Sequence, residues 1–392
     1  MSKEVFDAVA EAATRGTTGL LRNLLDVADR REVRTEILRT SEFHLVSALV
    51  GAAISADPID DDHLIAFYRS RQDKAVMNHL RTMADLSWLR ALLDDAGIAW
   101  AVVKGPFLVE HAYRRVDVRA YADLDVLVDR HRFGDALDVL EAHGARLIDR
   151  NWPLIASTQR GELSVVLPHG TLLDLHWHLV VDRSVRNGFR IDVDDVLGRR
   201  RVVGPVGAEF FALGADDAWF HTAMHAVLTG CDRLLWAIDL EKLLRVDGVP
   251  GADEWHRAQR NGWADAAAIA CDFLAAVFPD QDEMASQAPR STWRRVRQQI
   301  VRRNGLNRSL DGRFSAKLFT TSVRSGPSSS AKALASMAWA QAIKGPLVNP
   351  GHPWRRHKAG VSPTQRSPSP LKLDVPSASD RYAFVRAISV AS

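Results

Sequence analysis

Two aspartates stand two positions apart inside an apolar run, Asp123-Leu-Asp125-Val-Leu-Val128. The aliphatic and β-branched residues favour a β-strand, in which successive side chains point to opposite faces of the sheet. Asp123 and Asp125 therefore share one face, while Leu124, Val126 and Val128 point to the other face and toward a core. Since neighbouring carboxylates repel each other, the chain has to fold so that water or a divalent cation reaches the aspartate face.

A third carboxylate interrupts a second apolar run, Leu172-Leu-Asp174-Leu-His176. An acid among leucines is costly unless it is paired or bound to a metal. If the two strands are neighbours, three carboxylates converge into an all-oxygen set that suits Mg²⁺ or Mn²⁺. Such a set serves two-metal transfer of phosphoryl or nucleotidyl groups. Taken alone, however, Asp-x-Asp more often marks a solvated loop or the end of a strand.

Basic residues stand close to these two runs. Lys104-Gly105-Pro106 closes an apolar run at 98–103, and a glycine after a strand permits a tight turn that exposes N–H groups to an anion. Lys104 is suited to neutralising phosphate charge, and Arg119 to clamping a phosphate through two parallel donors. The alternative is a strand-ending turn with two solvated cations.

The spacing of apolar residues divides the chain into four parts. Residues 1–96 and 201–320 repeat apolar positions at three- and four-residue steps, which is typical of helices packed on a core. Between them, 97–200 holds short apolar runs separated by glycine turns, which predicts a small α/β domain. The Ser/Pro-rich basic tail at 321–392 is a poor core former, so we expect it to be largely disordered.

Composition places the chain among ordinary globular proteins, with 46% hydrophobic and 25% charged residues. No run reaches the roughly 18 uninterrupted apolar residues that a membrane span requires, so we expect no membrane contact. The start of the chain lacks the pattern of a signal peptide, and the sequence contains only two cysteines, Cys231 and Cys271. These features predict a cytoplasmic location.

The charge is distributed unevenly along the chain. Residues 290–392 contain 19 lysines and arginines against 3 acids, although the formal net charge of the whole chain is only +3. Within this part, 290–317 holds nine basic residues and one acid. Such a segment is able to grip RNA by its phosphates. We favour the alternative, in which this segment is a solvated helix or docks on the acidic body of the chain.

Three motifs in this order resemble the uncharacterised nucleotidyltransferase family of the DNA polymerase β-like superfamily. They are Val103-Lys-Gly-Pro-Phe-Leu108, Arg119-Ala-Tyr-Ala-Asp-Leu-Asp-Val-Leu-Val128 and Leu173-Asp-Leu-His-Trp177. A later helix similar to Leu234-Leu-Trp-Ala-Ile-Asp-Leu240 is also common there, so the resemblance covers about residues 80–250. It implies an α+β fold with a small mixed β-sheet nucleotidyltransferase core, flanked by an N-terminal helical region and a C-terminal helical domain and followed by the disordered tail.

The resemblance also implies roles for individual residues. Asp123 and Asp125 would be metal ligands, and Asp174 the third carboxylate, near the attacking hydroxyl. Lys104 and Gly105 would stand in the turn that binds the nucleotide phosphates. Most of the wider superfamily has Gly-Ser in this turn, with the serine on phosphate, whereas this chain has Gly-Pro.

These observations predict a Mg²⁺-dependent enzyme that transfers a nucleoside monophosphate from an NTP to an acceptor and releases pyrophosphate. The acceptor is left open between a small molecule, a peptide and an RNA end. The alternative is a non-catalytic nucleotide-binding or scaffold module whose basic tail contacts RNA or a protein partner.

Several histidines need a separate interpretation. His221 and His225 share one face of a predicted helix, but without a third ligand a packed or surface pair is favoured over a zinc site. The resemblance suggests that His225 and Asp239 line the acceptor side of the cleft. His176 either hydrogen-bonds and orients Asp174 or is a structural histidine.

Overall fold

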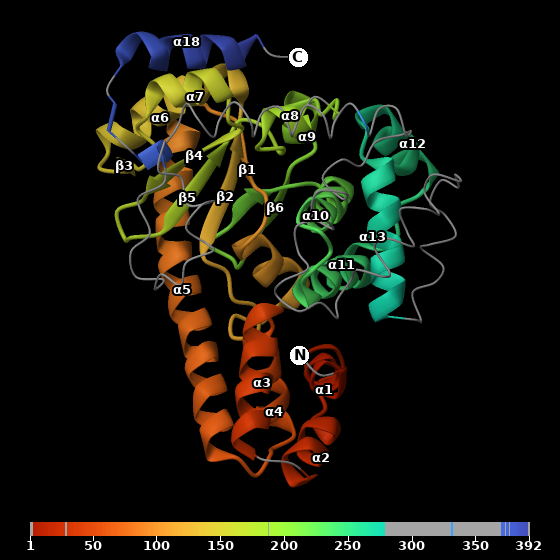
Figure 1. Ribbon diagram of the computed structural model, residues 1–392. Coiled ribbons are helices and arrows are strands. Elements are labelled where there is room, and N and C mark those ends of the chain that lie inside the picture. The colour runs from red at the N-terminus through yellow and green to blue at the C-terminus, as the bar shows by residue number, and fades with distance from the viewer. Residues whose placement is uncertain are drawn as a thin grey trace.

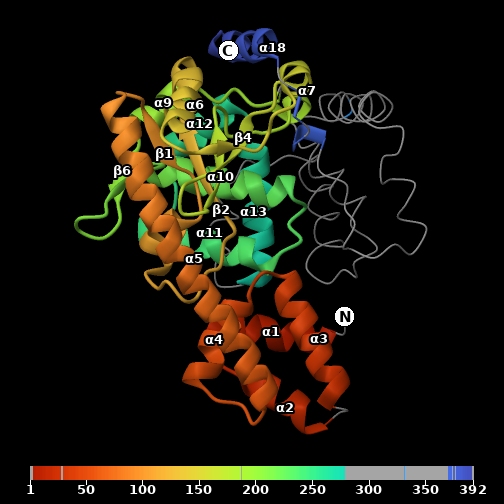
Figure 2. The same ribbon diagram turned by 90° about the vertical axis from the view of Figure 1, so that its left-hand side faces the viewer.

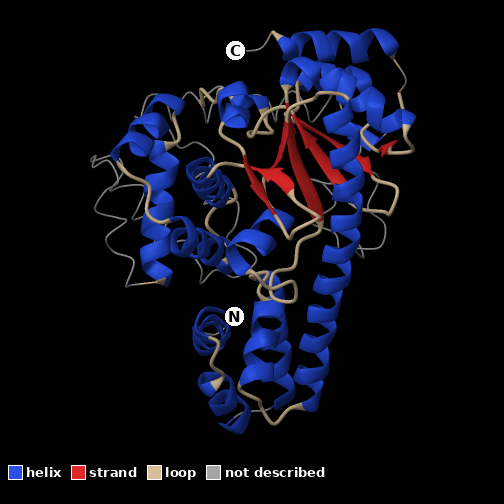
Figure 3. Cartoon of the chain, turned by 180° about the vertical axis from the view of Figure 1, so that it is seen from behind, coloured by secondary structure: helices blue, strands red, loops and turns tan. Residues whose placement is uncertain are grey.

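The computed structural model describes residues 3–27, 30–186, 188–278, 331 and 370–390, the last range without 373 and 376. A seven-stranded sheet forms its centre, with helices packed around it (Figures 1 and 3). The mixed sheet and flanking helices confirm the predicted α+β class. In the described part of the chain, no helix has both the length and the apolar character needed to cross a membrane.

The sheet has the strand order β3-β4-β5-β2-β1-β7-β6. Two neighbouring pairs, β2 with β5 and β1 with β7, run parallel, and the remaining pairs are antiparallel. The strands are β1 Trp100–Val102, β2 Asp123–Val128, β3 Arg146–Leu147, β4 Glu162–Val166, β5 Leu172–His176, β6 Arg201–Val203 and β7 Phe210–Ala212.

Helices precede, interrupt and follow the strands. The N-terminal group is α1 Lys3–Arg15, α2 Gly19–Val27, α3 Arg30–Phe43, α4 Ser47–Ala56 and α5 Asp62–Asp95. Within the strand-rich part lie a π-helical segment η1 Leu108–Tyr113, the 3₁₀ turn η2 Arg130–Arg132, α6 Phe133–Ala142, α7 Trp152–Thr158, α8 Arg183–Arg186 and α9 Val193–Gly198. Then follow α10 Ala215–Leu228, α11 Leu234–Asp247, α12 Ala252–Asn261, α13 Ala264–Val277, η5 Pro370–Lys372 and α18 Ala378–Ser389.

Helix α5 connects the N-terminal helices to the sheet (Figures 1 and 2). The helix begins after Asp61, whose side chain accepts the N–H of Leu64, as an N-cap does. It ends before Gly97, which has a positive φ of +63° and provides the left-handed turn that terminates a helix. With 34 residues at 1.5 Å each, α5 is about 50 Å long.

Two hydrophobic clusters adjoin each other through shared, partly buried residues, among them Tyr113 and Trp236. The larger one joins the sheet to the end of α5, to α6 and to α10–α13. The second one fills the N-terminal helices and extends into the start of α11 through Leu234, Leu235 and Ile238. Helices α5 and α11 therefore contribute to both clusters, and this arrangement positions the N-terminal helices close to the aspartate strands.

Helix α18 lies within the described part of the C-terminal tail. It packs on α7 and α6 at one end of the molecule (Figure 1), and Phe384 and Ile388 are buried. The structure thus describes a packed helix within the segment 321–392, which we expected to be largely disordered. Phe384, Val385 and Ile388 share one face of this helix, but nothing local in the sequence indicates which surface that face packs against. The predicted basic surface at 290–317 lies outside the described residues.

Candidate active site

The three predicted carboxylates converge on one face of the sheet. Strands β2 and β5 pair in parallel, with Asp125 opposite Asp174 in the register. One carboxylate oxygen from each of Asp123, Asp125 and Asp174 lies within 4.8 Å of the others. Leu124 and Val126 of the same strand are fully buried on the other face, as side-chain alternation requires. The convergence predicted from the two runs is confirmed.

The donor set of this carboxylate triad fits a divalent cation. All three side chains offer oxygen, which Mg²⁺ and Mn²⁺ prefer. Asp125 is only 3% exposed, and its Oδ2 is buried without a hydrogen-bond partner among the described residues. A buried acceptor without a donor is costly, and a metal ion bound to the triad would satisfy it. Asp123, Asp125 and Asp174 are thus the residues that would hold the ion.

Lys104 supplies positive charge next to the triad. Its Nζ lies 3.3 Å from Asp125 Oδ1 and 4.0 Å from Asp123 Oδ2. Burial favours the neutral form of Asp125, but Lys104 and His176 outweigh it and hold the pKa of this carboxyl well below its usual range. Lys104 and His176 therefore favour the ionised form of Asp125.

The other two carboxylates respond differently to the same environment. Burial, followed by repulsion from Glu162, raises the pKa of Asp174 to about 6. The pKa of Asp123 is also raised, by burial and by the charge of Asp125. The triad consequently combines one member whose ionised form is favoured with two members that bind protons more readily, and a bound cation would oppose that tendency.

His176 contacts the triad through Asp125, whereas an interaction with Asp174 was one of the two roles considered for it. Its Nε2 lies 3.1 Å from Asp125 Oδ1 and 3.5 Å from Glu162 Oε2, whereas Asp174 accepts a hydrogen bond of 2.8 Å from Ser164 Oγ. The reason is the strand pairing, because Glu162 of β4 stands directly opposite His176 of β5. Glu162 could not be identified from the sequence, because only the pairing of β4 with β5 places its side chain next to His176.

The predicted phosphate turn follows β1 and also contributes to the site. Gly105 has φ +69°, a conformation that glycine adopts without strain. A Cβ at this position would stand 3.2 Å from the backbone oxygen of Asp123. The turn thus packs directly against the start of β2, which places Lys104 beside the carboxylates.

Arg119 has a structural partner that was not foreseen. Its Nε and Nη2 donate to the two oxygens of Asp239, each over 2.8 Å, and Asp239 also accepts from the Tyr113 hydroxyl. Both acid and base are buried. The two donors predicted to clamp phosphate are therefore engaged, and Nη1 is the guanidinium nitrogen without a partner among the described residues. Asp239 serves this ion pair and does not line the cavity described next.

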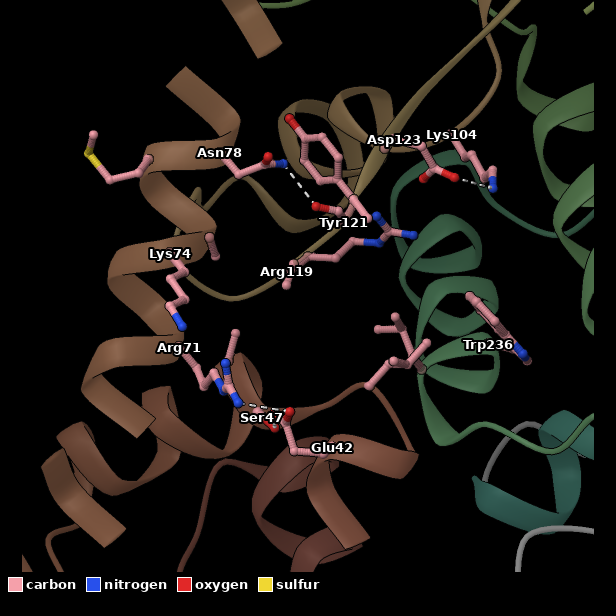
Figure 4. A pocket seen from close by; sticks show the side chains of 18 of the residues that line it. Glu42, Ser47, Arg71, Lys74, Asn78, Lys104, Arg119, Tyr121, Asp123 and Trp236 are labelled. Atoms are coloured by element: carbon pink, nitrogen blue, oxygen red, sulfur yellow. Dashed lines mark hydrogen bonds and ion pairs between the residues drawn. The ribbon is translucent and has the colours of Figure 1, made fainter. Parts of the chain in front are cut away.

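A cavity of about 1020 Å³ opens beside the triad. One wall consists of α3, α4 and α5, a second of Lys104, Gly105 and the segment 119–123, and a third of α10 and α11 (Figure 4). Asp123 is the triad member that lines it. The third wall includes His225, as predicted. Neither His225 nor His221 belongs to a group of described residues that could hold a metal.

The α5 wall carries basic residues that we did not single out from the sequence. Arg71, Lys74 and Arg81 all line the cavity. Their spacing of three and seven residues puts them on one face of a helix, and this spacing was the available signal. It could not be interpreted before the fold showed which face of α5 meets the cavity.

Comparison with known proteins defines the family. A family described as "Uncharacterised nucleotidyltransferase" matches residues 33–279. The chain belongs to this nucleotidyltransferase family. The matched region contains the triad, the phosphate turn and every wall of the cavity, and α18 lies outside it.

A solved structure with a related description shows a weaker similarity. The crystal structure of an antigenic nucleotidyltransferase-like protein from Paracoccidioides brasiliensis aligns over 54% of this chain and 94% of that chain, with 15% sequence identity and a TM-score of 0.37. A search of curated proteins finds no match to this member of the nucleotidyltransferase family.

Proposed function

We propose that the protein is a Mg²⁺- or Mn²⁺-dependent nucleotidyltransferase that moves a nucleoside monophosphate from an NTP to an acceptor. The nucleophile of the acceptor would form a bond to the α-phosphorus, the bond between this phosphorus and the bridging oxygen would break, and pyrophosphate would leave. The observation that carries the proposal is the carboxylate triad, with its oxygens within 4.8 Å of one another, in a chain of the nucleotidyltransferase family.

The protein's own groups suit distinct parts of this reaction. Asp174, whose carboxylate lies beside those of Asp123 and Asp125, is suited to accepting the proton of the attacking hydroxyl. Asp125 stays charged and, together with Asp123, would hold the metal. When bound, the divalent cation would neutralise phosphate charge and orient the reacting groups.

Lys104 and Gly105 are suited to binding the triphosphate of the NTP. The ammonium of Lys104 lies next to the triad, and a backbone turn with positive φ at Gly105 presents N–H groups to an anion. One nitrogen of Arg119, Nη1, has no hydrogen-bond partner in the part of the chain that the structure describes, so a single contact to phosphate is proposed for it in place of a two-donor clamp.

The proposal is tested by incubating the protein with NTPs labelled at the α-phosphate, Mg²⁺ or Mn²⁺, and cell extract separated into small-molecule, protein and RNA fractions. Label in one fraction identifies the acceptor class. Asp125→Asn should abolish transfer, and Asp174→Asn should reduce it by about 10²–10⁴-fold, the usual contribution of a general base.

Asp26→Asn provides the control, because Asp26 is a largely exposed aspartate of α2 outside the cavity lining. This variant should transfer label at the wild-type rate. If the wild-type protein labels no fraction and consumes no NTP, the reaction proposed here is incorrect and a non-catalytic module gains support.

A further inference from the structure

The cavity contains more positive charge than its own carboxylates neutralise. Five lysine and arginine side chains line it. Lys104 and Arg119 are engaged by the aspartates described above, and Arg71 Nη2 lies 2.9 Å from Glu42 Oε2. The remaining two are Lys74 and Arg81 of α5.

Lys74 and Arg81 are exposed, and neither forms an ion pair with any part of the chain that the structure describes. Arg81 Nη2 donates to the neutral side chain of Asn78, over 2.5 Å. Lys74, Asn78 and Arg81 follow one another at steps of four and three residues, so they occupy one face of α5. Two unpaired cations therefore face this side of the cavity.

These cations lie on a different wall from the triad. Figure 4 shows Lys74 on α5 and the pair of Asp123 and Lys104 on separate sides of the cavity. A divalent cation at the triad would take over the neutralisation of the carboxylates and free Lys104 for the triphosphate. Lys104, next to the strands, would then bind the phosphates of the nucleotide. Lys74 and Arg81 of α5 would remain available for a second anion.

The size and lining of the cavity agree with two substrates. Its volume of about 1020 Å³ stands at the upper end of the roughly 300–1,000 Å³ typical of sites for a single small molecule. Apolar side chains, among them Met77 and Trp236, line it together with the charged walls. An acceptor with an apolar body and one anionic group would match both kinds of surface.

We propose that the acceptor is a small anionic molecule whose phosphate or carboxylate group docks on Lys74 and Arg81 of α5, with its nucleophile directed to the triad. The proposal rests on the function proposed above and adds the substrate class. Arginine offers paired donors to either anion and lysine offers a compact charge. An RNA end is the competing outcome of the tests.

The first test measures the binding of inorganic phosphate by calorimetry at low ionic strength. The double variant Lys74→Gln/Arg81→Gln should bind phosphate about 10- to 100-fold more weakly than the wild type, as expected for the loss of charge-assisted hydrogen bonds. Arg69→Gln is the matched control, because Arg69 is exposed and lies on the opposite face of α5. Equal phosphate affinity in the wild type and the double variant would overturn the proposal.

A second arm separates this anion site from the triphosphate site. The wild type saturated with Mg²⁺ and α,β-methylene-ATP should still bind phosphate within twofold of its original affinity, and the double variant should bind the nucleotide analogue like the wild type. If the analogue displaces phosphate from Lys74 and Arg81, or needs them for its own affinity, these residues serve the NTP and the acceptor assignment is wrong.

The third arm uses transfer of label. The acceptor should be retained on anion exchange within the small-molecule fraction, and the double variant should raise its KM about tenfold or more with kcat within twofold. Label in RNA, or an unchanged KM, overturns the acceptor assignment while the transfer function stands. If the wild type binds phosphate as expected but labels no fraction, both the transfer function and the acceptor assignment are overturned. Lys74 and Arg81 would then form only an anion-binding site.

Discussion

Replacing Phe384 with alanine is expected to destabilise the docking of α18 by about 3–5 kcal/mol, the usual cost of truncating a buried phenylalanine. The ring is 1% exposed, and its centroid lies 6.1 Å from that of Phe133 and 6.4 Å from that of Trp152. The packing around the helix is close, since a Cβ on Gly134 of α6 would stand 2.7 Å from Val385. Little room is therefore available for neighbouring side chains to fill the space that the ring leaves.

Urea unfolding followed by tryptophan fluorescence measures this cost, because Trp152 reports on the docked helix. Tyr382→Ala is the control on the same helix, since Tyr382 is 68% exposed and its loss should change stability by about 0.5 kcal/mol or less. If α18 detaches before the rest of the protein unfolds, Phe384→Ala should lower the urea midpoint of this first transition alone. Equal effects of the two substitutions would refute the conclusion that Phe384 anchors α18 in solution.

Three further predictions concern the buried charges and the turn. Asp239→Asn leaves the guanidinium of Arg119 buried without its counter-charge and should lower the free energy of unfolding by about 3–5 kcal/mol; a loss below 1 kcal/mol in urea titrations would contradict this. His44 and His178 each accept a backbone N–H at Nδ1, and burial lowers the pKa of each to about 3. A histidine in the unfolded chain has a pKa of about 6.5, so below this pH the unfolded state binds protons that the folded state does not bind. The free energy of unfolding therefore falls with acidification, by about 2 kcal/mol for each histidine between pH 8 and pH 5. NMR titration should show neither ring protonating above pH 5, and a midpoint near 6.5 would disprove the burial argument. Gly105→Ala should cost about 1–2 kcal/mol for its positive φ and reduce NTP-dependent transfer; an unchanged transfer rate would show that this turn is not needed.

The carboxylate triad could be predicted from the sequence because strand geometry is local. Alternation alone puts Asp123 and Asp125 on one face, and the acid at 174 is costly in an apolar run unless another group compensates it. The single long-range assumption was that the two strands are neighbours, which the register of β2 and β5 confirms. The ends of α5 were predictable for the same reason, since a capping aspartate and a terminal glycine act within one turn.

The partners of the site residues could not be predicted, because they depend on packing between distant elements. Arg119 and Asp239 are 120 positions apart, and nothing local to either residue indicates the other. From the sequence, His176 either orients Asp174 or has a structural role, whereas in the fold it contacts Asp125 and Glu162 on neighbouring strands. The role of Lys74 of α5 could not be predicted either, because only the fold shows that this exposed side chain lines the cavity.

The pairing of Asp125 with Asp174 across β2 and β5 makes the chemistry dependent on strand alignment. A slip of β5 by a single residue would turn its aspartate to the opposite face and bring Leu173 or Leu175 into its place. Such a molecule would keep its helices and most of its hydrogen bonds, so circular dichroism would not distinguish it from the native one. Titration with a divalent ion would distinguish them, and it would thereby count the correctly aligned molecules in a preparation.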